Sequence, residues 1–314
     1  MMELALNFTQ LLLGIIILVW GANKFVDHSS VIAKHLGIND LVIGLTLIAA
    51  GTSAPEIFVA ISAVINGNEN IAFGTAIGSN ISNIALIFGV SCLFFNSPSK
   101  THLSNLFPFG LSILMLGLII VDGMISFSES IGLVGLFIVF MYILLKTEGI
   151  PEEEQSESTA FTKSLFLSMV GLAGLIAGAN ISIIFAENTA ALLGISELII
   201  GLTIMALGTS LPELAATIAA LRKGRHQMVV GNIIGSNVLN LVFVLPIIGF
   251  FGTIQINQTV LQRDFYILLV LSIVFIFLAF ALTKLRFVKS LYMTSGILLI
   301  SSYIFYISIL AGIV

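Results

Sequence analysis

The sequence predicts an all-α membrane protein of ten transmembrane helices, arranged as two inverted-topology five-helix repeats with broken helices at a central ion site. Composition is the first observation behind this prediction: 58% of the 314 residues are hydrophobic, 9% are charged, and the mean hydropathy is +1.14. A soluble domain carries roughly 25% charged residues. The second observation is a series of long apolar runs, and the third is a motif, GTSAPE at 51–56, that recurs as GTSLPE at 208–213.

The apolar runs define the expected helices. A spanning helix needs about 20 mostly apolar residues. Such runs give ten expected spans, at 9–26, 41–65, 71–95, 105–121, 130–146, 163–186, 196–221, 227–251, 265–283 and 288–312. The fourth and fifth are short and lie close together. The first is expected to be a membrane helix and not a cleaved signal, because Glu3 stands where a signal peptide has its basic region.

The basic residues support this helix count. With ten spans, one side of the membrane receives eleven lysines and arginines, namely Lys24, Lys34, Lys100, Lys146, Lys163, Arg222, Lys223, Arg225, Lys284, Arg286 and Lys289. The other side receives only Arg263. Because basic residues are enriched in cytoplasmic loops, we expect a multi-pass protein of the cell membrane with both termini outside.

An internal repeat divides the chain into halves. A shift of 157 residues aligns 43–56 with 200–213 at ten of 14 identical positions, and 74–83 with 231–240 at six of ten. We expect a first five-helix repeat over 1–146, an acidic cytoplasmic linker over 147–162, and a second repeat over 163–314. Because five is odd, the halves enter the membrane from opposite sides. Inverted repeats of this kind are typical of transporters that bind their substrate near the midplane.

The GTSAPE motif places a carboxylate and a helix break together in the membrane. Pro55 has no N–H to donate to the carbonyl of Gly51, and it also disfavours helical geometry at Ala54. The helix is therefore expected to break at 49–54 and to restart at Pro55. Unpaired backbone is tolerated at membrane depth only where it lines a cavity or is buried in protein, and a carboxylate there usually marks an ion pathway.

Both copies of the motif supply oxygen ligands. In the first copy these are the carbonyls from Ala49 to Thr52, the hydroxyls of Thr52 and Ser53, and the carboxylate of Glu56. In the second they come from Ala206 to Thr209, Ser210 and Glu213. Such hard ligands suit sodium, calcium or magnesium better than zinc or copper. The alternative is a Pro-kinked helix whose small residues serve packing, which explains one copy more easily than a duplicated pair.

A second repeated motif, GSNISN at 78–83 and GSNVLN at 235–240, adds further oxygen atoms. Ser79 and Asn83 are four residues apart and therefore share one helix face, as do Ser236 and Asn240. The glycines are explained by close helix packing. The side-chain carbonyls of Asn83 and Asn240 are candidates to lie near the glutamates.

At these motifs the chain resembles the calcium/cation antiporter superfamily, and within it the sodium/calcium exchangers of prokaryotic type. The resemblance covers essentially the whole chain. It implies that Glu56 and Glu213 bind calcium together with the backbone oxygens of Thr52 and Thr209. It implies further that sodium is held by serines and alanine carbonyls, at Ser53, Ser79, Ser210, Ser236, Ala49 and Ala206. The first and sixth helices would slide across the others to switch access.

This sequence departs from the superfamily at two places. Asn240 stands where potassium-dependent relatives have aspartate, which lowers the expectation of potassium co-transport. The loop between the halves is too short to hold the regulatory domains of animal exchangers.

The expected function is therefore exchange of sodium for calcium by alternating access at a midmembrane site. A proton/calcium (cation) exchanger is the nearest alternative, since both glutamates can carry protons, and a passive cation channel or a membrane scaffold is a more distant one. No nucleophile–base pair or nucleotide loop indicates an enzyme. The expected partners are calcium and sodium ions as substrates and the lipid bilayer, with no cofactor, nucleic acid or obligate protein partner.

Overall fold

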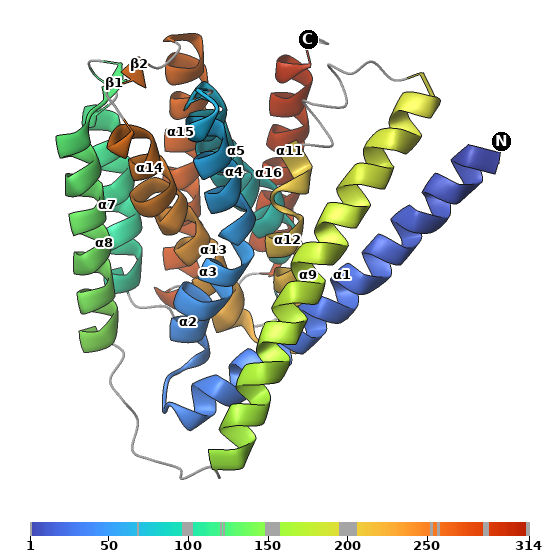
Figure 1. Ribbon diagram of the computed structural model, residues 1–314. Coiled ribbons are helices and arrows are strands. Elements are labelled where there is room, and N and C mark those ends of the chain that lie inside the picture. The colour runs from blue at the N-terminus through green and yellow to red at the C-terminus, as the bar shows by residue number, and fades with distance from the viewer. Residues whose placement is uncertain are drawn as a thin grey trace.

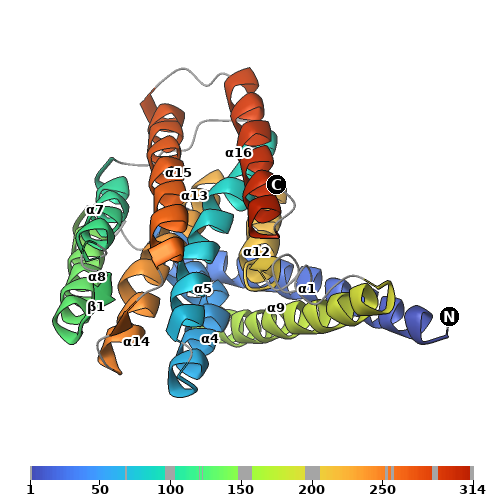
Figure 2. The same cartoon turned by 90° about the horizontal axis from the view of Figure 1, so that it is seen from above.

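Two very long helices dominate the computed structural model, which describes residues 2–67, 69–95, 103–119, 121, 123–147, 158–194, 206–251, 254–255, 258–284 and 289–311. They are α1 (Met2–His35) and α9 (Ser158–Leu192). The two run side by side in opposite directions along one edge of the molecule and are strongly tilted against the other helices (Figures 1 and 2). Each helix extends beyond the expected spans 9–26 and 163–186, so α9 begins inside the segment predicted as the linker.

Glycines let these helices approach closely. A Cβ atom placed on Gly21 would collide with the backbone of Leu175, and one placed on Gly178 would collide with the backbone of Leu18. Small residues at such crossings bring backbones into van der Waals contact, which is the main source of helix association in lipid. The glycines at these positions therefore favour close packing of α1 against α9.

The first expected break is present, but it is narrower than the sequence predicts. The chain runs through α2 (Asp40–Ile43), a π-helical turn η1 (Gly44–Ile48) and α3 (Ala49–Thr52) before α4 (Ala54–Ile65). Only Ser53 leaves helical geometry, and the two helical parts meet at an angle of 42°. The prediction that the break covers all of 49–54 was therefore too wide, because Ala49–Thr52 keeps its helical turn.

Matching segments of the two sequence halves have matching secondary structure. Helix α4 (Ala54–Ile65) corresponds, 157 residues later, to α12 (Leu211–Arg222). Helix α5 (Glu69–Ser82) corresponds to α13 (His226–Leu239) with the same offset. Two further π-helical turns follow at corresponding places, η2 (Asn83–Phe88) and η5 (Asn240–Val244). The short helix α11 (Ala206–Gly208) precedes α12, and the first part of the expected span 196–221 lies outside the described residues.

The remaining elements complete a helical bundle. They are α6 (Gly89–Phe94), α7 (Leu103–Ile119), α8 (Phe127–Thr147), α14 (Leu245–Phe250), α15 (Gln258–Lys284) and α16 (Lys289–Leu310). A two-residue antiparallel pairing of β1 (Met124–Ile125) with β2 (Ile254–Gln255), which the sequence did not predict, joins the loops that follow α7 and α14. The start of α1 and the end of α16 lie at the same end of the molecule as this pairing (Figure 1).

The helices are suited to a bilayer. Among the described residues, seven helices are long and apolar enough to cross a membrane, and the bent pair Asp40–Thr52 and Ala54–Ile65 adds an eighth. The fourth expected span corresponds to a shorter apolar helix, Leu106–Ile119. The structure thus shows an all-helical, multi-pass arrangement, and the full count of ten spans stays a prediction.

Candidate functional site

The two glutamates of the repeated motif lie at equivalent places, in the first turn of α4 and of α12. Each helix starts after a serine with nearly identical backbone angles, φ −83° and ψ 4° at Ser53 and φ −89° and ψ 3° at Ser210. A proline follows near the start of each helix, where its missing N–H costs no hydrogen bond. The first turn of a helix also favours a negative charge. Local sequence thus explains why both carboxylates stand just beyond a break.

Both carboxylates are buried and accept hydrogen bonds from serine hydroxyls. The exposed fraction is 0% for Glu56 and 1% for Glu213. The hydroxyl of Ser53 donates to Oε1 of Glu213 at 3.1 Å, and the hydroxyl of Ser79 donates to Oε1 of Glu56 at 3.3 Å. The first of these bonds joins the two sequence halves, so each GTS-x-PE motif contributes to one common cluster.

The threonines of the motifs join the same cluster. Thr52 Oγ1 lies 3.5 Å from the hydroxyl of Ser236, and Thr209 Oγ1 lies 3.5 Å from the hydroxyl of Ser79. These two contacts are equivalent under the 157-residue shift. The carbonyl of Ala49 accepts from the N–H of Ser53 at 2.9 Å and from the hydroxyl of Thr52 at 3.3 Å. The Ala49 carbonyl is therefore already hydrogen-bonded within its own helix, whereas the sequence predicts an unpaired carbonyl there.

Several buried oxygen atoms of the expected site have no hydrogen-bond partner within the described residues. They are Oε2 of Glu56, Oε2 of Glu213, Oδ1 of Asn83, Oδ1 of Asn240 and Oγ of Ser210. The element that begins with Asn83, η2, packs against α12, and the one that begins with Asn240, η5, packs against α4. Buried polar atoms normally have partners, so a group of acceptors without them is what a cation site requires. Ala206 stands at the start of α11, and its side chain lies outside the described set.

The chemistry of this donor set is that of hard cations. Carboxylate, hydroxyl and amide oxygens are the ligands of sodium, calcium and magnesium, whereas zinc sites use histidine and cysteine. Among the described residues, no group of three or more His, Cys, Asp and Glu side chains is placed to hold a metal. The site thus has two carboxyl groups surrounded by neutral oxygens.

Sequence reasoning missed one buried link to this cluster. Thr52 Oγ1 lies 3.4 Å from Oδ1 of Asn232, and Nδ2 of Asn232 donates to the hydroxyl of Thr217 at 3.2 Å. The corresponding residues of the first half are Thr75 and Ala60, which do not repeat the Asn–Thr pair. The signal was therefore present, as polar residues in one half that the other half lacks.

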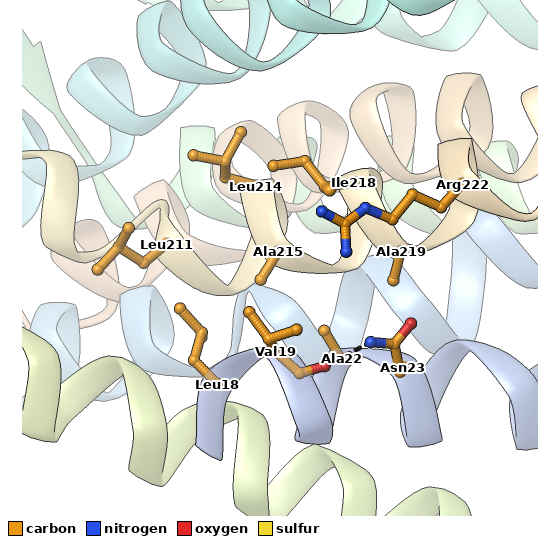
Figure 3. A pocket seen from close by; sticks show the side chains of 10 residues that line it. All are labelled: Leu18, Val19, Ala22, Asn23, Leu211, Leu214, Ala215, Ile218, Ala219 and Arg222. Carbon is orange, nitrogen blue, oxygen red and sulfur yellow. Dashed lines mark hydrogen bonds between the residues drawn. The ribbon is translucent and has the colours of Figure 1, made fainter. Parts of the chain in front are cut away.

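Two pockets flank the cluster at equivalent places of the two halves. The α4–α9 pocket lies between those helices, has a volume of about 620 Å³ and is lined in part by Phe58, Ser62, Ile176 and Asn180. The α1–α12 pocket has a volume of about 180 Å³ and is lined at the corresponding positions by Ala215, Ala219, Val19 and Asn23. Figure 3 shows Ala215 and Ala219 of α12 pointing toward α1. Equivalent pockets thus differ more than threefold in volume.

Comparison with known proteins indicates one family. The family described as "Sodium/calcium exchanger protein" matches residues 6–146 and 163–312. The chain is 33% identical over 307 residues to the putative antiporter CaxA of Alkalimonas amylolytica, covering 94% of this chain and 95% of that protein. It is 32% identical over 326 residues to the sodium/calcium exchanger MaX1 of Methanosarcina acetivorans, covering 86% of this chain and 90% of the relative.

A solved structure of the sodium-calcium exchanger NCX_Mj, soaked with 10 mM Na⁺ and zero Ca²⁺, superimposes with a TM-score of 0.85. The two chains are 32% identical, and the match covers 97% of this chain and 99% of that one. Fold, site and relatives together define an integral membrane cation antiporter. The chain belongs to the sodium/calcium exchanger family.

Proposed function

We propose that this protein exchanges sodium for calcium by alternating access at a midmembrane site. The buried pair of glutamates carries the proposal, since Glu213 accepts from Ser53 of the first half, and Glu56 accepts from Ser79, whose hydroxyl also lies 3.5 Å from Thr209 of the second half. The relatives named as sodium/calcium exchangers support sodium and calcium as the ions. The proposed ion ligands are Glu56, Glu213, Thr52, Thr209, Ser53, Ser210, Ala49, Ala206, Ser79, Ser236, Asn83 and Asn240.

The balance of charge at the two glutamates couples the movement of calcium to that of sodium. Two ionised glutamates carry a charge of −2, which one calcium ion or two sodium ions neutralise. A buried site with two uncompensated charges is costly in a low dielectric. Closure over the site therefore favours the loaded forms, and the two ions compete for the same oxygens. Competition of this kind couples the outward movement of calcium to the sodium gradient.

We further propose that the chain forms ten spans in two inverted repeats, over 1–146 and 163–314, with both termini outside the cell membrane. The matched bounds of α4 with α12 and of α5 with α13 support the repeat. The left-handed glycines support it as well, since Gly37 and Gly67 recur as Gly194 and Gly224. The basic residues support the orientation.

The unequal pockets support alternating access. Under the proposed orientation the larger α4–α9 pocket lies on the outer half and the smaller α1–α12 pocket on the cytoplasmic half. In an inverted repeat, exchange of the two local conformations turns an outward-facing protein into an inward-facing one. We therefore infer that the structure faces outward, and that sliding of the α1–α9 pair reverses the two pocket sizes.

The test uses the purified protein in proteoliposomes. Vesicles loaded with sodium are diluted into sodium-free buffer with tracer calcium, and calcium uptake is followed. The proposal requires uptake that disappears when sodium is equal on both sides. Uptake that ignores sodium but follows a pH gradient would establish the proton-coupled alternative. Flux too fast for alternating access would indicate a channel, and absence of any flux would contradict transport.

A further inference from the structure

Lysine 223 connects the end of α12 to α1 beside the smaller pocket. Its Nζ atom lies 2.7 Å from Oδ1 of Asp27 and donates to the carbonyl of Asn23 at 3.0 Å. Asn23 itself lines the α1–α12 pocket, together with Arg222, the neighbour of Lys223 (Figure 3). Separation of α1 from α12 at this place must therefore break an ion pair and a charge-assisted hydrogen bond.

A second cation of the same turn makes a similar connection. Arg225 donates through one guanidinium nitrogen to Oδ1 and Oδ2 of Asp40 at 3.1 and 3.2 Å, and also to the hydroxyl of Ser30. Ser30 is on α1, and Asp40 is the first residue of α2. The α12–α13 turn thus holds both α1 and the segment that follows it.

The larger pocket has no equivalent of the contacts that Lys223 makes beside the smaller pocket. Under the 157-residue shift, Lys223 corresponds to Asn66 and Asp27 corresponds to Ile184, so both charges are absent. Asn66 lines the α4–α9 pocket, and its Nδ2 donates to the carbonyl of Ser62 on its own helix. Arg225 likewise corresponds to the uncharged Asn68.

We propose that Lys223 and Arg225 are positioning residues that hold the α1–α12 pocket closed and so bias the antiporter toward its outward-facing form. The proposal rests on the alternating access proposed above. An ion pair that forms in only one of two conformations shifts the equilibrium between those conformations by the full free energy of the pair. Because the outer positions equivalent to Lys223, Asp27 and Arg225 are the uncharged Asn66, Ile184 and Asn68, neither ion pair has an equivalent that compensates in the inward-facing form. Each pair is partly exposed, so each contributes a modest share.

The test compares the accessibility of the two pockets. Cys92 is the only cysteine and is buried, so a Cys92→Ala background allows single reporters at the equivalent positions, Ser62→Cys and Ala219→Cys. A membrane-impermeant maleimide is added from the outer side for the first reporter and from the cytoplasmic side for the second. Lys223→Asn, which installs the residue of the other half, is expected to raise labelling at 219 and lower it at 62, each by up to about fivefold.

Matched variants separate this effect from a general loss of charge or of structure. Lys34→Asn removes a lysine of α1 for which no ion pair is found in the described chain, and it should leave both rates unchanged. The exchanged pair Asp27→Lys with Lys223→Asp should restore the labelling of the parent protein. The pair Asn66→Lys with Ile184→Asp builds the contact on the outer side and should shift labelling in the same direction as Lys223→Asn.

The outcomes are distinguishable from a failure of the proposed function. If Lys223→Asn and the outer pair both leave the two labelling rates unchanged in protein that elutes as a folded peak, the inference is wrong. If labelling shifts as expected while the parent protein shows no sodium-dependent calcium uptake, the bias is established and the choice of ions is wrong.

Discussion

At the scale of residues, the chemistry concentrates in two glutamates that the protein buries completely. Glu56 and Glu213 each accept a hydroxyl hydrogen bond on one oxygen, and the second oxygen of each has no partner among the described residues. Isolated carboxylates at such a depth are expensive. Their presence as an equivalent pair supports the proposal that a shared cation supplies the compensating charge.

Glu213→Gln is expected to abolish sodium-dependent calcium uptake, by at least about a hundredfold, because it removes one of two buried charges while preserving shape. The measurement is the initial rate of tracer uptake in proteoliposomes. Glu3→Gln, an exposed glutamate in the first turn of α1, serves as the matched control and should transport normally. Near-normal flux in Glu213→Gln would remove this residue from the site.

Ser53→Ala tests the bond between the two halves. The serine hydroxyl donates to Oε1 of Glu213 at 3.1 Å, and a hydrogen bond to a charged group contributes about 1.5–3 kcal/mol. We expect the half-saturating sodium concentration to rise by about tenfold or more. Ser91→Ala is the control, since this buried serine donates only within its own helix turn, to the carbonyl of Ile87. An unchanged sodium dependence in Ser53→Ala would show that this hydroxyl does not serve the ions.

At the scale of elements, the α1–α9 pair combines tight packing with a proposed role in movement. Gly21 and Gly178 bring the two backbones together, so the pair moves as one body in the proposed exchange. The other helices that carry the site are interrupted, by a break at Ser53 and by π-helical turns that start at Asn83 and Asn240. Such turns are frequent at functional sites.

Gly21→Ala is expected to destabilise the protein by about 1–3 kcal/mol, because the added methyl group meets the backbone of Leu175. The midpoint of thermal unfolding in detergent should fall by several degrees. Gly135→Ala in α8 is the matched control, since a Cβ atom there has no heavy atom within 4 Å. Equal unfolding midpoints for the two variants would mean that the α1–α9 crossing is not tightly packed.

At the scale of the whole molecule, the two halves have nearly the same sequence pattern but not the same surroundings. The α4–α9 and α1–α12 pockets are equivalent in position and unequal in volume. A polypeptide with two similar halves can place them in two different local conformations, and exchange of those conformations moves access from one side to the other. The charges at the α12–α13 turn make the two sides energetically unequal.

The proposed orientation is testable by labelling from each side of intact cells or vesicles. In the Cys92→Ala background, Glu3→Cys is expected to react with an impermeant maleimide added outside, because the basic residues place the N-terminus there. Ser156→Cys, in the expected cytoplasmic linker 147–162, should react only after the membrane is permeabilised. The opposite pattern would invert the topology and exchange the roles assigned to the two pockets.

Much of the candidate site is accessible from sequence because its determinants are local. Pro55 and Pro212 each stand near the start of a helix, and a glutamate one residue later then stands in the first turn. The bounds of α4 and α12 differ by the same 157 residues as the sequence repeat. The width of the break was overestimated, since helical bonding through Ala49–Thr52 depends on neighbours that a local rule does not include.

The sequence by itself determined that the chain belongs in a membrane, that its halves repeat, and that paired carboxylates follow helix breaks, since composition and short-range sterics decide these features. Only the tertiary structure decided that Ser53 meets Glu213, that Asn232 links Thr52 to Thr217, and that Lys223 ties α12 to α1. Each of these contacts joins residues far apart in the chain, so each depends on how tilted helices pack. The unequal pockets follow from the same packing, because α1 packs more closely against α12 than α9 packs against α4.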